Sequence, residues 1–312
     1  MNLKRILGIT AVSLFLVAGL GYHYLIGYVV SIPLDSKVTI LQRKNILRQI
    51  GANVIVYKND GQAIIVDTQL SPLASSTRRD IENLGINKPA KVIITHWHPD
   101  HSGGIPAFSI DTEVVAHINV LQKLSAPQEG IDLTRPGSHH QFAARAEVGL
   151  PNQPISDRID LMLGDAPVSV AHYPRAHTDG DLVVFFRQSQ AMAIGDLVWP
   201  GSFPFVDVHS GGSVVGLEAA IQSILDESNT GFRFIPGHGL SLTHEELLAY
   251  LKMINQTRNW VESQLDAGKS IDQVISTGLP GDWEMWASSL VPVSSWIKMI
   301  HQSRINDNET GL

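Results

Sequence analysis

The chain reads His96-Trp97-His98-Pro99-Asp100-His101 directly after the run Lys91-Val92-Ile93-Ile94-Thr95. The run is apolar and rich in β-branched residues, which is typical of a short buried strand. Because side chains alternate along a strand, His96 and His98 are expected to point the same way at its end. Pro99 then turns the chain, so that Asp100 and His101 can reach a neighbouring point. Imidazole and carboxylate groups bind zinc or iron, so the stretch predicts a metal site with two ions side by side.

The bulk composition indicates a folded globular protein. The chain has 312 residues, of which 44% are hydrophobic and 17% charged, enough for one large domain or two small ones. The formal net charge is -7 and no long basic run occurs, so we expect no nucleic-acid partner. The sequence has no cysteine, which excludes disulfides, thiolate metal ligands and a cysteine nucleophile.

Residues 1–30 are expected to lie outside the globular fold, as a transmembrane anchor or a signal peptide. Lys4 and Arg5 precede an apolar stretch of about 25 residues that runs to Val30, which is long enough to span a bilayer. A signal peptide has a shorter apolar region that ends at a small-x-small site. A basic segment ahead of an apolar one is the usual layout for export. The catalytic domain is therefore expected outside the cytoplasm, anchored to the membrane or exported, and in the periplasm if the source is bacterial.

The rest of the chain divides by its hydrophobic pattern. Residues 31–52 are predicted to form a connector with some helical character. Strand-like runs then flank Asn59-Asp60-Gly61, which is a strong hairpin signal. The predicted elements of this part are strands at 53–57, 62–66, 112–116, 168–173, 182–187 and 191–195, and a helix over 73–84. Residues 125–165 are expected to be irregular, as a lid over the site or a surface excursion.

The last third of the sequence is predicted to be helical. Thr243 and Glu246 have the spacing of a capping box, and the helix that they begin is expected to end at Gly268. Ser270 and Gln273 repeat the same signal for a shorter helix. These signals divide the globular part into a catalytic domain over 53–268 and a C-terminal helical extension over 269–312.

Three later segments each place one more ligand-type residue beside small residues near a predicted strand. They carry His177, Asp196 and His238. Small residues let the backbone come close to a crowded centre. A further aspartate, Asp67, directly follows the second predicted strand.

In these motifs the chain resembles the metallo-β-lactamase superfamily of metal-dependent hydrolases, from about Asn53 to about Tyr250. Five motifs of that superfamily occur in order. They are Asp67, His96-x-His98-x-Asp100-His101, His177, Asp196 and His238. The resemblance implies an α/β fold, a four-layer αββα sandwich with the metals at one rim of two paired sheets.

The resemblance also implies a role for each ligand. The first metal would be held by His96, His98 and His177, and the second by Asp100, His101 and His238. Asp196 would bridge the two ions, and Asp67 would accept a hydrogen bond from behind the site. The cofactor would be two zinc ions (Zn2+) per chain, with iron or manganese as alternatives.

The chemistry that follows is hydrolysis. Two ions that share a water make hydroxide available near neutral pH. This hydroxide would attack the carbonyl of an ester, thioester, lactone or amide in a small-molecule substrate. Asp100 is expected to orient it, and His209 is the candidate proton donor to the leaving group. Trp199, Phe203 and Phe205 either form an apolar pocket wall or belong to the core.

The residue at position 196 separates the branches that the resemblance leaves open. Zinc β-lactamases usually carry cysteine or serine at this motif, whereas glyoxalase II and lactonases use aspartate. The glyoxalase-II-like or lactonase-like branch is therefore favoured. The alternatives are β-lactamase activity, a mononuclear iron oxygenase of the persulfide dioxygenase type, and a membrane-anchored binding protein that has lost catalysis.

Overall fold

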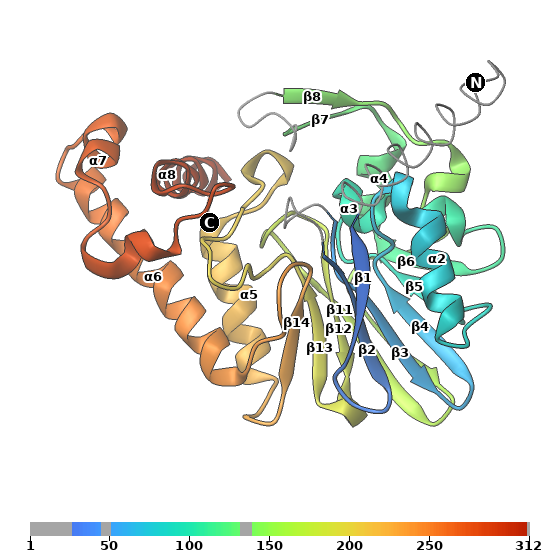
Figure 1. Ribbon diagram of the computed structural model, residues 1–312. Coiled ribbons are helices and arrows are strands. Elements are labelled where there is room, and N and C mark those ends of the chain that lie inside the picture. The colour runs from blue at the N-terminus through green and yellow to red at the C-terminus, as the bar shows by residue number, and fades with distance from the viewer. Residues whose placement is uncertain (1–26, 45–50, 132–138, 311–312) are drawn as a thin grey trace, which may run out of the picture.

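Two β-sheets lie face to face at the centre of the molecule, with helices on both outer sides (Figure 1). The computed structural model describes residues 27–44, 51–131 and 139–310. The first sheet contains, in spatial order, β1 (Tyr28–Pro33), β2 (Val38–Lys44), β3 (Val54–Asn59), β4 (Gln62–Val66), β5 (Lys91–Ile93), β6 (Glu113–His117) and β9 (Gln153–Ile155). The second contains β10 (Arg158–Leu163), β11 (Ala166–Tyr173), β12 (Asp181–Phe186), β13 (Ala191–Gly195) and β14 (Arg233–Pro236).

The helices divide between the two outer faces. On the side of the first sheet lie α2 (Ala74–Asn83), α3 (Pro99–Ser102) and α4 (Ile118–Ser125). On the side of the second sheet lie α5 (Val214–Asp226), α6 (His244–Asp266), α7 (Ile271–Thr277) and α8 (Val293–Thr310). Short 3-10 turns are η1 (Ser71–Leu73), η2 (Ile105–Ala107), η3 (Glu147–Gly149), η4 (Arg187–Ser189), η5 (Val208–Ser210) and η6 (Gly281–Trp286).

The alternation of side chains along each strand builds the layers. In β4, Ile64 and Val66 enter a core that lies between the two sheets, whereas Ile65 packs with Ile81 of α2 in a second core. A third core joins the second sheet to α5, α6 and α8 and includes the fully buried Trp296. Three cores between four layers make the predicted αββα sandwich, and this prediction is confirmed.

Local signals in the sequence are confirmed where the turn or cap chemistry is strong. The hairpin between β3 and β4 turns at Asp60 and Gly61, whose φ angles of 49° and 73° are the positive values that a type I′ turn requires. Capping boxes at Thr243 and Ser270 begin α6 and α7. The helices of the predicted extension share the third core with α5 and α6, so the boundary at residue 268 does not separate two cores.

The predicted connector over 31–52 is wrong for its first part. Residues 28–33 and 38–44 form β1 and β2, which pair with each other and, through β2, with β3. Val38 and Ile40 face the core between the sheets, while Leu41 faces the helices. Because both faces of β2 are covered, no alternation of polar and apolar residues marked it as a strand.

The stretch 125–165 is more regular than predicted. It contributes β9 to the first sheet and β10 to the second. It also forms a two-stranded antiparallel sheet of β7 (Gln128–Ile131) and β8 (His139–Phe142). Pro154 lies in β9 at the edge of the first sheet, where proline is tolerated.

The predicted N-terminal anchor or signal peptide concerns residues 1–30. Positions 1–26 lie outside the described residues, and Tyr28, Val29 and Val30 belong to β1. Across 27–44, 51–131 and 139–310, no helix combines the length and the apolar character needed to cross a bilayer.

Candidate metal centre

Seven side chains gather where strands of both sheets end. They fall into two sets, and within each set the ligand atoms lie within 4.8 Å of one another. The first set contains His96, His98, His177 and Asp196, and the second contains Asp100, His101 and His238. The first sheet supplies the members that follow β5, and the second sheet supplies those that follow β11, β13 and β14.

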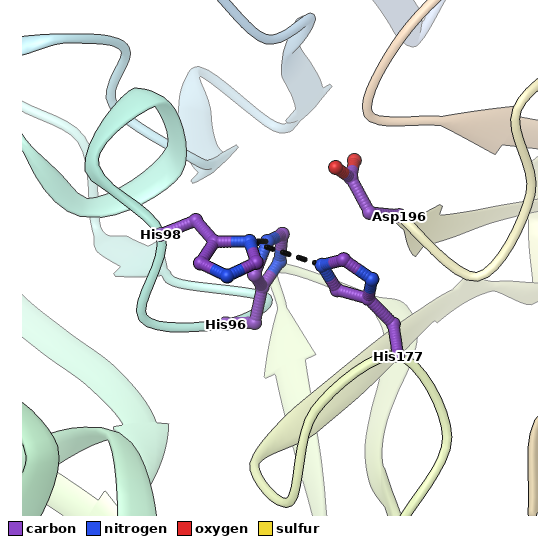
Figure 2. Close-up of side chains that lie close together, drawn as sticks. All are labelled: His96, His98, His177 and Asp196. Atoms are coloured by element: carbon purple, nitrogen blue, oxygen red, sulfur yellow. Dashed lines mark hydrogen bonds between the residues drawn. The ribbon is translucent and has the colours of Figure 1, made fainter. Parts of the chain in front are cut away.

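In the first set, three imidazoles converge on one point and the Asp196 carboxylate approaches from the loop after β13 (Figure 2). His98 Nδ1 lies 3.0 Å from His96 Nε2 and 3.0 Å from His177 Nε2. His96 is 1% exposed and His177 is 0% exposed, so bulk water does not surround the pair.

Each of these imidazoles is held from behind by a group that accepts a hydrogen bond. His177 Nδ1 donates to the Phe205 carbonyl oxygen at 2.6 Å, and His98 Nε2 donates to Asp207 Oδ2 at 3.1 Å. His96 Nδ1 lies 3.1 Å from Thr95 Oγ1, whose own proton is directed at the Asp67 carboxylate. Thr95 therefore accepts from His96, and the three inward nitrogens present lone pairs to one another.

Lone pairs at this separation repel unless a cation lies among them. Protonation is disfavoured, because burial and then the neighbouring imidazoles hold the pKa of His96 well below its ordinary value. Burial, together with His98, lowers the pKa of His177 to about 4. Neutral imidazoles with fixed outer hydrogens are what a metal ion requires, so the first set fits a zinc-like ion.

The second set combines imidazoles with carboxylates. His238 Nε2 lies 3.1 Å from Asp100 Oδ2 and 3.4 Å from Asp196 Oδ2. His101 Nε2 lies 3.3 Å from Asp196 Oδ1. Asp196 belongs to the first set by its ligand atom and contacts both imidazoles of the second, so it stands between the two sets.

Two buried atoms, one from each set, face each other without a well-aligned hydrogen bond. Among the described residues, His101 Nε2 and Asp196 Oδ1 lie 3.3 Å apart as an ion-pair contact, but neither makes a well-aligned hydrogen bond, although both are shielded from solvent. A buried polar atom without a partner costs free energy. A metal ion between them would satisfy both, so the second set also fits the metal that the resemblance implies.

The charges of the second set attract one another strongly. Burial opposes ionisation, but His101 and His238 lower the pKa of Asp100 to about 2. Burial likewise opposes the protonation of His238, but Asp196 and Asp100 raise its pKa to about 9. The carboxylates stay ionised, and they hold protons on the neighbouring imidazoles. A divalent cation can replace these protons.

Asp67 lies behind the second set, as predicted. Its Oδ2 accepts from His101 Nδ1 at 2.7 Å, and its Oδ1 accepts from the Thr95 backbone N–H at 2.8 Å. Asp67 has a φ of 64°, an unusual backbone conformation for an aspartate. These contacts orient His101 so that Nε2 faces the site.

The ligand side chains leave no room for a Cβ at position 237. A Cβ on Gly237 would lie 2.1 Å from Asp196 Oδ1 and 2.5 Å from His101 Cε1. Glycine is therefore required at this position, which agrees with the glycine-rich turn that the sequence places before His238.

The structure does not bring the predicted proton donor, His209, into either set. Within the described part of the chain the two ligand sets exclude His209, whose side chain is exposed on η5. Its neighbour Asp207 is instead the residue that reaches the site, through His98. Sequence reasoning missed Asp207, and the only available signal was a carboxylate in the loop after Asp196.

The three aromatic candidates separate into two roles. Trp199 stacks on the His238 ring with centroids 4.4 Å apart, and the Phe205 ring lies 5.9 Å from the His177 ring. These two border the metal centre. Phe203 is fully buried and stacks on Trp296, so it belongs to the core.

Comparison with known proteins agrees with this geometry. A model of the metallo-beta-lactamase superfamily matches residues 47–246. The chain is 25% identical over 169 residues to the acyl-coenzyme A thioesterase MBLAC2 of Homo sapiens, which covers 48% of this chain and 60% of that protein. It is 21% identical over 236 residues to the beta-lactamase-like protein 2 homolog of Caenorhabditis elegans, covering 72% of this chain and 65% of that protein. The chain thus spans less than two thirds of the length of these relatives.

Solved structures share the fold at low identity. A metallo-beta-lactamase from Pontibacter korlensis has a TM-score of 0.59 and 16% identity, covering 73% of this chain and 99% of the other. The sec-alkylsulfatase Pisa1 from Pseudomonas sp. has a TM-score of 0.68 and 13% identity, covering 88% of this chain and 50% of the other. With the family model spanning most of the catalytic part and both ligand sets in place, the chain belongs to the metallo-β-lactamase superfamily, a family of metal-dependent hydrolases that generally bind zinc.

Proposed function

We propose that this protein is a two-metal hydrolase that cleaves the acyl bond of an ester, thioester, lactone or amide in a small molecule. The observation that carries the proposal is the position of Asp196. Its carboxylate is a member of the first ligand set and lies 3.3 Å from His101 and 3.4 Å from His238 of the second. One carboxylate that faces both sets supports two adjacent ions, with zinc as the metal of choice for this mixture of imidazole and carboxylate.

When bound, the two ions would lower the pKa of a water molecule between them and polarise the carbonyl oxygen of the substrate. The chain's own residues prepare the site for this. His177, His98 and His101 donate outer hydrogen bonds to the Phe205 carbonyl and to the Asp207 and Asp67 carboxylates, respectively. These bonds fix which nitrogen of each of the three rings faces inward. Asp100, with its pKa lowered to about 2, is an anion at neutral pH and can accept a proton or a hydrogen bond from water.

Within the proposed substrate class, thioesters are the favoured substrates. The relative that is named an acyl-coenzyme A thioesterase matches about half of this chain, and aspartate rather than cysteine or serine stands at position 196. Aromatic side chains border the site on two sides, which supports an apolar acyl group next to the reacting carbonyl.

A hydrolysis screen with metal analysis on the same sample tests the proposal. The purified chain would be assayed against an acyl-coenzyme A, a p-nitrophenyl ester, a lactone, a β-lactam and a secondary alkyl sulfate. We expect about two zinc ions per chain by mass spectrometry and hydrolysis of at least one carbonyl substrate. Asp196→Ala should lower turnover roughly a thousandfold, since it removes a carboxylate shared by both sets.

Asp226→Ala is the matched control, because Asp226 is an exposed aspartate at the end of α5. It should retain wild-type turnover and metal content. One iron per chain with oxygen consumption would instead support the oxygenase alternative. Unchanged turnover in Asp196→Ala would contradict the proposed mechanism.

A further inference from the structure

The loop between β13 and α5 touches the first ligand set and the C-terminal helices with alternate residues. Phe205 and Asp207 face the metal centre, where the Phe205 carbonyl accepts from His177 and the Asp207 carboxylate accepts from His98. Phe203, Val206 and Val208 instead contact the C-terminal part of the chain. We call residues 203–208 the bridging loop.

The outward-facing residues of the bridging loop are bonded to the C-terminal part of the chain. The Phe203 N–H donates to the Trp286 carbonyl of η6 at 2.8 Å, and the Val206 N–H donates to Met299 Sδ of α8 at 3.4 Å. The Val208 carbonyl accepts from Asn306 Nδ2 at 3.4 Å. All three contacts come from backbone groups of the loop, so they fix its path rather than one side chain.

The face of α8 that meets this loop is continuous. Met299 and Asn306 are seven positions apart, which is about two helical turns, so they lie on one side of the helix. Ser303 lies between them and accepts from the Val214 N–H at 2.9 Å, where α5 begins. The helix therefore supports the bridging loop along its length.

The second ligand set has a different support. His101 is held by Asp67, which in turn binds Thr95, and these residues follow β4 and β5 of the first sheet. The contacts described above link α8 to the partners of the first set, and those that hold His101 come from the opposite side of the sandwich. The bridging loop thus holds His98 and His177 of the first set, whereas Asp67 holds His101 directly and reaches the first set only through Thr95 and His96.

We propose that α8 positions the histidines of the first metal through the bridging loop, and that Met299 and Asn306 act as positioning residues for that metal. The inference rests on the proposed function, because it concerns a metal that the ligand geometry fits. Partners of metal-bound histidines commonly change metal affinity 10- to 100-fold when removed. A weaker, indirect effect on the first metal alone follows for residues one step further away.

The test uses variants that leave the packing intact. Met299→Leu keeps the side-chain volume and removes the sulfur that accepts from Val206, and Asn306→Ala removes the donor to Val208. The double variant Met299→Leu/Asn306→Ala is compared with Asp207→Ala, which removes the partner of His98 directly. Arg304→Gln is the matched control, because Arg304 lies on α8 but binds Asp266 and the Glu262 carbonyl of α6.

Zinc affinity is measured by competition with a chelator, in the full chain and again with Asp100→Ala, which removes a ligand of the second set only. We expect Asp207→Ala to weaken the first site roughly 10- to 100-fold and the double variant about tenfold, with the second site unchanged. Arg304→Gln should bind both ions like wild type. In the metal-free protein, nitrogen NMR of the imidazoles should show the Nε2–H form of His98 in wild type and a mixture of the two neutral forms in Asp207→Ala.

Three outcomes would overturn the inference. They are wild-type affinity of the double variant at the first site, an equal loss at both sites, and an unchanged His98 tautomer in Asp207→Ala. Failure of the wild-type chain to bind zinc at all would count against the proposed function instead, so the two failures are distinguishable. Thermal unfolding of the metal-free variants checks that each one is folded at the temperature of the titration.

Discussion

Asp67 Oδ2 accepts a hydrogen bond from His101 Nδ1 at 2.7 Å, with both side chains completely buried. The contact joins the end of β4 to α3 and leaves His101 Nε2 directed at Asp196. A buried carboxylate behind a metal-binding imidazole fixes the ring and increases its basicity. The strained φ of 64° at Asp67 is maintained by this network.

Replacing Asp67 tests this relationship without disturbing the backbone. Asn tolerates positive φ nearly as well as Asp, so Asp67→Asn removes the charge and keeps the conformation. We expect zinc affinity at the second site to fall roughly 10- to 100-fold, and to fall less at the first site, which Asp67 reaches only through Thr95. Metal content after dialysis against a weak chelator measures it, and retention of two ions at wild-type affinity would refute the assigned role.

Gly237→Ala should disturb the second set through space alone. The new Cβ would lie 2.1 Å from Asp196 Oδ1, so the carboxylate or the turn must move. We expect a loss of stability of about 1–3 kcal/mol together with loss of the second ion and of turnover. Gly149→Ala is the control, since its Cβ would meet the nearest atom at 3.4 Å, an ordinary contact. Equal metal content in both variants would show that the turn has more room than the structure indicates.

Stability of the metal-free protein should fall as the pH drops below neutrality, in part because of His117. Its Nδ1 accepts from the Asn119 N–H and its ring stacks on His172 with centroids 3.6 Å apart. Burial, together with His172, lowers the pKa of His117 to about 4. The unfolded chain therefore binds a proton more readily, so the stabilising contribution is complete above about pH 6.5 and is lost progressively as the pH falls toward 4.

Urea unfolding at pH 7.5 and pH 5 measures this dependence. His117→Asn keeps a side chain that can cap α4 and cannot titrate. The midpoint of wild type should fall more between the two pH values than that of His117→Asn. Because the histidines of the metal centre titrate in both proteins, only the difference between the two slopes is attributed to His117. Identical slopes would remove His117 from the explanation.

Removing the metals should loosen the whole sandwich. A ligand present at a thousand times its dissociation constant stabilises a protein by about 4 kcal/mol, so chelation should lower Tm by roughly 10 °C. The double variant His98→Ala/Asp100→Ala lacks one ligand of each set, and EDTA should leave its Tm unchanged. An equal Tm of wild type with and without EDTA would mean that the sets hold no metal under these conditions.

The ligand set could be predicted from the sequence because each member sits beside a recognisable strand or a glycine-rich turn. Two of the partners that hold the first set, Asp207 and the Phe205 carbonyl, could not. His98 and Asp207 are 109 positions apart, and the acceptor for His177 is a backbone carbonyl, which carries no residue signal. Their contact depends on the path of one loop, and that path depends on α8.

In the fold, too, some elements could be predicted from the sequence and others could not. The β3–β4 hairpin and the capping boxes could be predicted, because the residue types at each of them are specific to that local structure. Strand β2 has none, since its neighbours in space cover both of its faces and its polar residues interrupt the apolar run. The prediction of a connector there failed because burial by distant strands leaves no periodic signature in the sequence.

Each ligand set takes members from both sheets, so neither metal site is complete until both sheets have folded and docked. The first sheet alone offers His96 and His98 to one ion and Asp100 and His101 to the other, and the remaining ligands arrive only with the second sheet. A chain with one sheet formed would therefore present no more than two side chains to either ion. Stoichiometric zinc uptake during refolding would then report the moment at which the two halves dock, independently of any substrate.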